Sequence, residues 1–503
     1  MRPLVAVAVA ALAGAMALHV VLATPLGREP SGHAPASPPA TLPFDLPPAE
    51  DLRASPRLVF AHYWPPLPIS IDNEPPERDY YARNYLTPDG EAGKHAAYGG
   101  HLRDRPLPRP PSPHPDWRLR DMKKEVRQAA AAGLDGFTLD VLQVEADPDV
   151  RVWENARLLL RAAEEVDPGF RVMLMPDLSG SLVDKSPEQL AAAMATLAGS
   201  PAAFRLADGR LVVAPFKAEA HDPPWWQTFR SVMRAEHGLD VALVPVFVGD
   251  ERELGPRFAE VSYGLSRWGA RNPEWNDPAD VTRDGTLARV ARMRELRPLW
   301  MQPVSVQDAR PRQGIFDEAE NTTNLRRTWQ LARESGAQWV QVPTWNDYTE
   351  STHIAPSVDH GWTFLDLMSF YLTWFKMGEE PEVVRDAVYV THRTQPWDAE
   401  PRVDQTLTMQ PRGGSAPRDT VEALAFLTRP ARVTVTVGGR STTCRAPAGV
   451  SACTAPLRPG RVSAAVTRAG ARVASVTSPH EVTDEPTVQD LAYVGVGSLR
   501  RPG

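Results

Sequence analysis

Two stretches indicate the fold class of this chain: LDGFTLDVL at residues 134–142 and FRVMLMPD at residues 170–177. Both are short apolar runs that end on or near an aspartate, and a helical segment at residues 153–165 lies between them. Strands buried on both faces have this near-continuous apolar character, and two of them joined by a helix form the β-α-β unit of a parallel sheet. The sequence therefore predicts an α/β fold.

The unit repeats along the chain in both directions. Six further apolar runs predict strands, at residues 58–64, 211–216, 241–248, 261–268, 299–305 and 339–345. Helices are predicted at residues 116–132, from 186 onward, and at 226–236, 286–295, 318–335 and 361–377. Eight strands that alternate with helices indicate a (β/α)8 TIM barrel. An open, doubly wound sheet is disfavoured, because no glycine-rich phosphate loop opens any of the helices.

The N-terminal residues carry a targeting pattern. Arg2 precedes a long uncharged apolar run, so residues 1–23 are predicted to be a signal peptide or an uncleaved N-terminal anchor. Residues 24–56 are rich in proline and alanine and are predicted to be a linker with no fold of its own. We therefore expect a secreted or extracellular protein, which contacts a membrane only if the N-terminal segment is retained as an anchor.

The pattern changes after the barrel, which is expected at residues 57–380. Residues 431–437 alternate with a period of two, and similar short runs follow. A β-sandwich domain is therefore expected at residues 386–500, although residues 421–427 are compatible with a helix as well as with a strand. Cys444 and Cys453 are the only cysteines of a chain predicted to be exported, and we expect them to form a disulfide.

Composition narrows the class of function. The chain has 55 basic and 62 acidic residues, a net charge of −7 and a pI near 6.0, which argues against nucleic acid as a partner. Two cysteines are too few for a cysteine-ligated zinc ribbon or an iron–sulfur site, and the motifs of serine hydrolases, zinc peptidases and P-loop proteins are absent. No cofactor and no metal are expected. Carboxylates and aromatic residues remain, as glycoside hydrolysis requires.

Chemistry in a (β/α)8 barrel takes place at the C-terminal ends of the strands. Acidic residues lie at four of the predicted strand ends: Asp140, Asp177, Glu219, and the segment TWNDYTESTH at residues 344–353. In that segment Asp347 and Glu350 are three residues apart and can both face the cleft, which suits a proton donor and a base that activates water. The alternative is structural, because either acid could instead cap the next helix or pair with an arginine.

Several other residues at strand ends are candidates for contact with a sugar. His62 and Tyr63 end the first strand, and Trp268 and Trp345 could stack on the apolar face of a pyranose. Core packing is the alternative for each of them. His353 is interpreted as a loop residue, because the sequence shows no cluster of metal ligands around it.

Residues 65–115 form a proline-rich insertion after the first strand, too long for a plain connection. The insertion must emerge on the catalytic face, and it contains four tyrosines among polar residues. It is predicted to form a rim that shapes the cleft, with a disordered surface loop as the alternative.

The segment TWNDYTES at residues 344–351 resembles the T-W-N-D-Y-G-E-S motif of glycoside hydrolase family 71, the α-1,3-glucanases or mutanases. Residues 58–63 and 132–137 are similar to other parts of that family. The resemblance implies an inverting hydrolase of α-1,3-glucan in which Glu350 is the general acid and Asp347 the general base. Asn346 of the motif is a candidate for substrate contact. Asp140 and Asp177 are candidates from their strand-end positions, with an ordinary loop cap as the alternative for each. Thr349 replaces the usual glycine of the motif.

Two alternatives remain open at this point. One is an enzyme of the family 99 type that acts on α-mannans; that family has two glutamates at the corresponding positions, so Asp347 favours family 71. The other is a cell-surface protein that binds glycans without cleaving them, and the retained acid pair argues against it. In either enzyme the partner is a polysaccharide. The sequence leaves the mode of attack, endo or exo, and the oligomeric state open.

Overall fold

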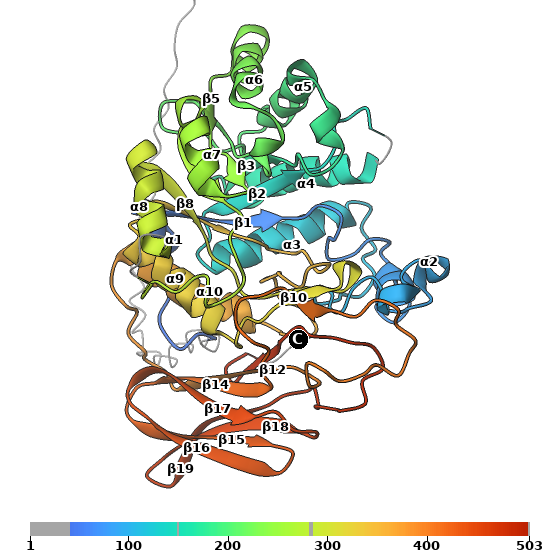
Figure 1. Ribbon diagram of the computed structural model, residues 1–503, viewed down its shortest axis with the longest axis vertical. Helices are drawn as coiled ribbons and strands as arrows, with labels where there is room; N and C mark the ends of the chain where they lie inside the picture. The colour runs from blue at the N-terminus through green and yellow to red at the C-terminus, as the bar shows by residue number, and fades with distance from the viewer. Residues whose placement is uncertain (1–40, 148–149, 281–284, 501–503) are drawn as a thin grey trace, which may run out of the picture. The chain divides into compact units, whose positions relative to one another are not determined.

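The computed structural model describes residues 41–147, 150–280 and 285–500 (Figure 1). The predicted signal peptide or anchor at residues 1–23 and the first part of the predicted linker lie outside these ranges. Within the described residues, no helix is both long enough and apolar enough to cross a membrane.

Parallel strands form the centre of the molecule, in the order β5-β4-β3-β2-β1-β11-β8-β7-β6. The strand bounds are β1 Leu58–Tyr63, β2 Gly136–Val141, β3 Arg171–Pro176, β4 Leu211–Val213, β5 Val241–Leu243, β6 Val246–Phe247, β7 Gly264–Arg267, β8 Leu299–Pro303 and β11 Trp339–Val342. β5 and β6 are two halves of one strand interrupted at Pro245. Val246 N–H donates to the Pro215 carbonyl and Ser266 N–H to the Pro245 carbonyl, so this strand joins both ends of the sheet. The ring closes, and the predicted (β/α)8 barrel is confirmed.

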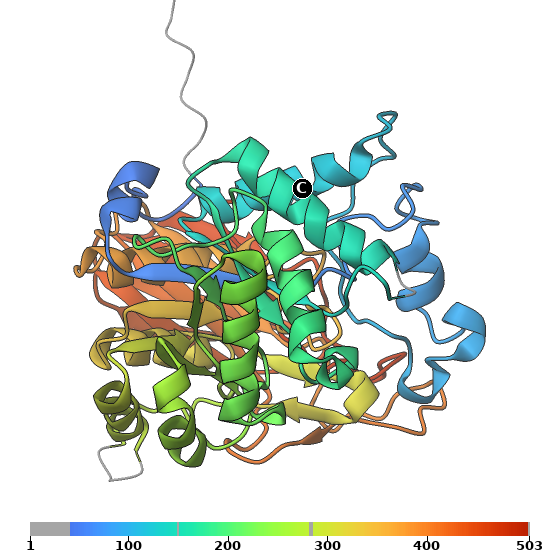
Figure 2. The same cartoon turned by 90° about the horizontal axis from the view of Figure 1, so that it is seen from above.

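Helices follow the strands and pack around the barrel (Figure 2). Their bounds are α3 Trp117–Ala131, α4 Val150–Val166, α5 Pro187–Ala198, α6 Pro223–His237, α7 Glu251–Phe258, α8 Thr286–Leu296, α9 Thr323–Glu334 and α10 Thr363–Met377, with short 3-10 turns at Ser181–Asp184, Ala218–Ala220, Ala259–Val261 and Pro311–Gln313. Ser186 begins α5 through a reciprocal capping box with Gln189.

Side chains that alternate along each strand form two cores, one inside the barrel and one between the barrel and its helices. In β1, Phe60 points into the barrel with Met173, Val212 and Met301, among others. Its neighbours Val59 and Ala61 pack outward against the helices. Side chains of a strand alternate between the two faces, so His62 shares the inner face of Phe60, whereas Tyr63 shares the outer face. This parity decides which strand-end residues reach the catalytic face.

The insertion after β1 is ordered and contains η1 Tyr81–Tyr85, α2 Gly90–Gly93 and η2 Ala96–Tyr98. It has a small core in which Leu67, Tyr81 and Leu102 pack with Tyr348 of the loop after β11. The alternative of a disordered surface loop is therefore wrong. A second excursion follows β8, where β9 (Asp308–Arg310) and β10 (Ile315–Asp317) form an antiparallel pair, and β13 (Gln410–Pro411) pairs with β10.

The C-terminal residues form the expected β-sandwich of two four-stranded antiparallel sheets, β17-β14-β12-β20 and β16-β15-β18-β19. The bounds are β12 Ala387–His392, β14 Thr420–Leu427, β15 Ala431–Val437, β16 Arg440–Ala446, β17 Gly449–Pro456, β18 Val462–Arg468, β19 Ala471–Thr477 and β20 Val494–Gly497. The segment compatible with a helix, residues 421–427, is thus strand β14. It is buried on both faces, which explains its weak alternation: Val421 and Ala423 face the other sheet, and Phe426 packs on Phe370 of α10.

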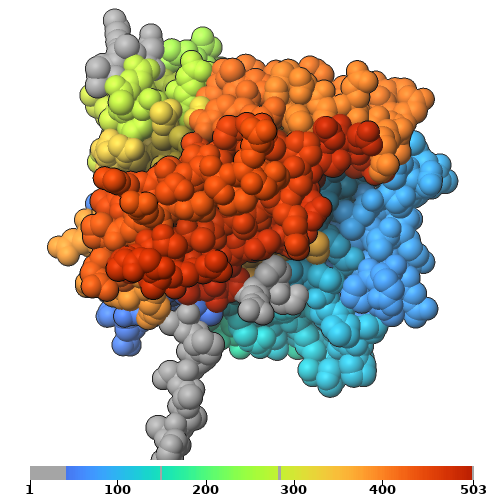
Figure 3. Space-filling model, turned by 90° about the horizontal axis from the view of Figure 1, so that it is seen from below, coloured from blue at the N-terminus to red at the C-terminus, as the bar shows by residue number. Residues whose placement is uncertain are grey.

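A disulfide between Cys444 of β16 and Cys453 of β17 is present, as expected. Because β16 and β17 belong to different sheets, the bond joins the two layers of the sandwich. Figure 3 shows the sandwich in orange and red, with the insertion after β1 in blue beside it. The two segments are in contact, since Arg103 donates to the Gln489 carbonyl over 2.7 Å.

The prediction of an unstructured linker through residue 56 is wrong for its described part. Helix α1 (Ala49–Ala54) lies there, and Leu42, Phe44 and Leu52 are buried. The rings of Phe44 and Phe370 meet edge to face at 5.4 Å. The segment has few large apolar residues, but Leu42, Phe44 and Leu52 are buried, and average composition does not reveal this.

Candidate active site

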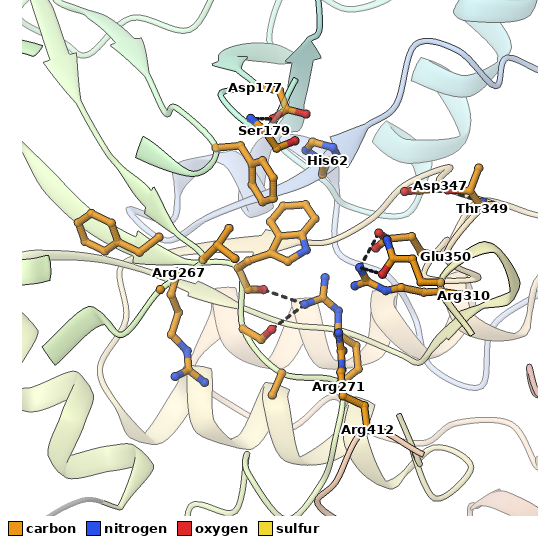
Figure 4. Close-up of a pocket in the computed structure, with 18 of the residues that line it drawn as sticks. His62, Asp177, Ser179, Arg267, Arg271, Arg310, Asp347, Thr349, Glu350 and Arg412 are labelled. Carbon is orange, nitrogen blue, oxygen red and sulfur yellow. Dashed lines mark hydrogen bonds and ion pairs between the residues drawn. The ribbon is translucent and has the colours of Figure 1, made fainter. Parts of the chain in front are cut away.

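A cavity of about 1340 Å³ opens at the C-terminal ends of the barrel strands (Figure 4). Six of the residues predicted from the sequence line it: His62, Asp140, Asp177, Trp268, Asp347 and Glu350. They come from β1, β2 and the loops after β3, β7 and β11. The structure therefore brings both members of the predicted acid pair and four predicted substrate contacts to one place.

Asp347 lies on the loop after β11 and is held by neighbours on the same loop. Its Oδ1 accepts hydrogen bonds from the main-chain N–H of Thr349 over 2.8 Å and from the Thr349 hydroxyl over 2.6 Å. Its own N–H donates to Thr344 Oγ1 over 2.9 Å. Two donors on one oxygen fix the orientation of the carboxylate. Thr349, which departs from the family motif, supplies a hydroxyl donor that glycine lacks.

Glu350 faces a guanidinium group from another excursion of the chain. Arg310 Nη1 lies 2.7 Å from Glu350 Oε1, and Arg310 also donates to both oxygens of Asp308 over 2.6 Å. Burial raises the pKa of Glu350 to about 8; Arg310 opposes this rise and the nearby Asp347 adds to it. A carboxyl group with such a pKa is protonated at neutral pH and can donate a proton.

Two more acids, Asp140 and Asp177, and a histidine, His62, also line the cavity. Burial, together with the charges of Asp177 and Asp347, raises the pKa of Asp140 well above its usual value. His62 Nε2 lies 3.3 Å from Asp140 Oδ2, and burial lowers the pKa of His62 to about 4. Asp177 accepts a hydrogen bond from Ser179 N–H over 2.6 Å. His62, with its lowered pKa, therefore offers a neutral imidazole at neutral pH, and Asp140 lies beside it as a second hydrogen-bonding group.

Sequence reasoning missed the arginines of the cavity. Arg271 is 1% exposed, lies 5.2 Å from the centre of the Trp268 ring and donates to the main-chain carbonyls of Trp268 and Gly269. Arg271 follows β7 closely, so the strand-end rule applied to basic residues could have found it, whereas Arg310 lies at the end of β9 in the separate excursion after β8. Arg412, which donates to both oxygens of Asp317, comes from beyond the barrel, and no local pattern places it at the site.

Three predicted substrate contacts do not line the cavity. Tyr63 points outward, where its hydroxyl donates to Glu125 Oε2 over 2.8 Å. Trp345 is fully buried and its ring packs against Phe137 at 5.1 Å. Asn346 accepts from Trp64 N–H and donates to the Trp64 and Leu67 carbonyls. These placements disagree with direct contact to substrate and give the three residues a supporting position behind the site.

Glu219 is also structural, since its Oε1 accepts from the N–H groups of Val248 and Gly249.

The insertion after β1, by contrast, contributes to the cavity. Its residues Pro66, Leu67, Tyr85 and His101, and Trp64 just before it, belong to the lining. This agrees with the prediction of a rim. Trp275 also lines the cavity, is 43% exposed and is able to stack on a sugar.

One group of side chains in the described ranges could hold a metal ion, namely Asp104, His353 and His360. None of them lines the cavity. The interpretation of His353 as a residue without companion ligands is therefore wrong: its companions come from a distant insertion and from the turn before α10.

A (β/α)8 barrel with a hydrogen-bonded aspartate, a glutamic acid of raised pKa and tryptophan faces around one large cavity defines the class of glycoside hydrolases. The comparisons with known proteins agree. The model of glycosyl hydrolase family 71 matches residues 114–499, and the chain belongs to this family. The resemblance found in the sequence is thus confirmed, and the chain is an enzyme of the glycosidase type.

Two individual relatives have low sequence identity to this chain. A glucan endo-1,3-alpha-glucosidase of Schizosaccharomyces pombe is 24% identical over 409 residues, which cover 76% of this chain and 91% of that protein. A mutanase of Penicillium rubens is 24% identical over 407 residues, covering 76% and 85%. Among solved structures, an endo-alpha-mannosidase of family 99 from Bacteroides thetaiotaomicron has a TM-score of 0.47 and 16% identity over 63% of this chain and 97% of that chain.

Proposed function

We propose that this protein hydrolyses α-1,3-glucan with inversion of the anomeric configuration, with Glu350 as general acid and Asp347 as general base. One observation carries the proposal: the two acids share one loop and line one cavity, and their surroundings differ. Burial raises the pKa of Glu350 to about 8, whereas Asp347 accepts two hydrogen bonds on one oxygen. A buried carboxyl group of raised pKa suits the general acid, and a carboxylate oriented by two donors suits the general base.

The acid step uses the proton of Glu350. At neutral pH the protonated carboxyl donates to the glycosidic oxygen as the bond to the anomeric carbon breaks. Arg310, 2.7 Å from Glu350, then stabilises the carboxylate that remains. Burial thus keeps Glu350 protonated before the proton transfer, and Arg310 stabilises the Glu350 carboxylate after it.

The base step uses the carboxylate of Asp347. It takes a proton from a water molecule that attacks the anomeric carbon from the face opposite the leaving group, which inverts the configuration. The donors on Oδ1 fix the orientation of the carboxylate, so its basic oxygen is held in place when the substrate binds.

The substrate class rests on the two relatives, whose names specify endo action on α-1,3-linked glucan and a mutanase. We assign contact with the glucose units to His62, Asp140, Asp177 and Trp268. The carboxyl group of Asp140 can hydrogen-bond to a sugar hydroxyl, and a tryptophan ring that lines the cavity can stack on the C–H face of a pyranose. An endo mode fits a polysaccharide that lies across the cavity.

Export is part of the proposal. The apolar run within residues 1–23 has the composition of a signal peptide or anchor, and the Cys444–Cys453 disulfide suits an oxidising exterior. Fractionation of the producing cells, with sequencing of the N-terminus of the recovered protein, separates a cleaved from an anchored form. Recovery of the mature chain from the cytoplasm alone would contradict export.

The test of the activity is release of reducing ends from insoluble α-1,3-glucan, compared with β-1,3-glucan, dextran and α-mannan, while proton NMR records the anomer formed first. We expect activity on α-1,3-glucan and a β-anomer as first product. An α-anomer would overturn inversion. Activity on α-mannan alone would favour the family 99 type of reaction, and binding without cleavage would favour a glycan-binding protein.

A further inference from the structure

A second cluster of chemically active side chains lies outside the cavity. Asp104 comes from the insertion after β1, His353 from the loop after β11, and His360 from the turn before α10. One ligand atom of each residue can be chosen so that all three lie within 4.8 Å of one another. His353 Nε2 and Asp104 Oδ2 are 2.9 Å apart, and the rings of His353 and His360 stack with their centres 4.6 Å apart.

These side chains are buried and only partly satisfied. His353 and His360 are each 1% exposed and Asp104 is 4% exposed. Neither ring nitrogen of His360 makes a hydrogen bond of good geometry, and Nδ1 of His353 also lacks a partner. Buried polar atoms in proteins are almost always paired, so three unpaired imidazole nitrogens beside a carboxylate call for a ligand that the protein atoms do not supply.

The donor set indicates the class of that ligand. Two imidazoles and a carboxylate are typical ligands of zinc, which binds them at about 2.0–2.2 Å. Tetrahedral ligands at that distance lie about 3.3 Å from one another. The present separations of 2.9 Å and at most 4.8 Å can reach this value by rotation of the imidazole rings.

We propose that Asp104, His353 and His360 bind one zinc ion, which ties the insertion after β1 to the loop of Asp347 and Glu350. Asp104 lies 249 residues before His353, whereas His360 follows in the same connection between β11 and α10, so one ion would join the insertion to this connection. His353 lies three residues after Glu350, so the ion would fix the C-terminal end of the loop that carries the acid pair. Since none of the three residues lines the cavity, the role is to hold the loop and not to act on the substrate.

The experiment measures metal content in the full, tag-free protein. The protein is stripped with a chelator, incubated with zinc, dialysed against metal-free buffer and analysed by elemental mass spectrometry, and its melting temperature is recorded with and without zinc. We expect about one zinc per chain and a higher melting temperature with the metal. Failure of the wild-type protein to take up zinc would overturn the proposal, whatever the variants do.

Variants locate the site. His360→Asn and Asp104→Asn should each lose the bound zinc and the rise in melting temperature. His392→Asn is the matched control, because His392 is equally buried but both of its ring nitrogens have partners in the protein, and it should keep one zinc. Zinc that persists in both site variants, or that is lost in the control as well, would contradict the assignment. Metal uptake without glucan hydrolysis would leave this site standing and remove only the proposed function.

Discussion

The hydroxyl of Thr349 donates to the oxygen of Asp347 that also accepts the Thr349 main-chain N–H. We predict that Thr349→Val, which keeps the shape and removes the donor, lowers kcat on α-1,3-glucan roughly tenfold, since a hydrogen bond to a charged group contributes about 1.5–3 kcal/mol. Thr349→Ser restores a hydroxyl and is the control that should stay close to wild type. A loss in Thr349→Ser as large as that in Thr349→Val would contradict the role of the hydroxyl hydrogen bond.

Arg310 governs the ionisation of Glu350. The general acid must be protonated, and burial raises the pKa of Glu350 to about 8, so activity should fall as the pH rises through about 8. Arg310 opposes that rise in pKa, so Arg310→Met should move the alkaline limb of the profile of kcat/KM to higher pH while lowering kcat. Profiles measured from pH 5 to about 10 test both effects. A limb that moves to lower pH in the variant would contradict the assignment of Glu350 as the acid.

At the scale of single residues, parity explains what the sequence could and could not reveal. Phe60 and His62 lie on the same face of β1. The residue two positions before a strand-end residue therefore shows which face of the strand that residue occupies. Applied to Tyr63, the same rule places the side chain with Ala61 on the outer face, as found. The sequence motif around Asp347 identified the acid pair, but not the arginine beside it, because Arg310 comes from a separate excursion of the chain.

The insertion after β1 is the element that shapes one side of the cavity. Tyr85 belongs to the lining, and its ring contacts that of His101 at 4.8 Å. We predict that Tyr85→Ala raises KM several-fold for long glucan and shifts the distribution of product lengths, with little effect on a short aryl glycoside. Chromatography of the products over time tests this. Arg78→Ala, an exposed change in the same insertion, is the control, and product patterns that match in all three proteins would argue against a rim.

Elements were predictable where strands and helices are long and strongly patterned, as in β1 to β3 and α10. The hairpin of β9 and β10 was not, because each strand has only three residues and the pairing depends on contact with β13 from beyond the barrel. Helix α7 was also missed, since Gly255 and Pro256 inside it disfavour a helix locally and burial of Leu254 and Phe258 stabilises it.

On the scale of the whole molecule, the Cys444–Cys453 disulfide joins the two sheets of the sandwich. The double variant Cys444→Ser, Cys453→Ser should lower the free energy of unfolding by roughly 2–3 kcal/mol, because the bond closes a short loop in the unfolded chain. Urea unfolding measures this, and catalytic activity at 25 °C should remain because neither cysteine lines the cavity. A reductant should destabilise the wild type and leave the variant unchanged; equal effects on both would argue against the bond.

The disulfide could be predicted because the chain has only two cysteines, but its bridging of two sheets depends on the sandwich topology. The same limit applies to Asp104, His353 and His360: the insertion and the last barrel loop meet only in three dimensions, so no spacing in the sequence marks the group. Local sequence patterns do not predict contacts between segments that are distant in the sequence.

The central claim is that Glu350 donates the proton and Asp347 activates the water. The most direct measurement is turnover of Glu350→Gln and Asp347→Asn on α-1,3-glucan and on an α-1,3-oligoglucoside with an activated aryl leaving group. Each variant should lose about 10²–10⁴-fold on glucan. The aryl substrate, which needs little protonation, should largely restore Glu350→Gln but not Asp347→Asn. The reverse pattern would exchange the two roles, and near-normal turnover of both variants on glucan would contradict the account.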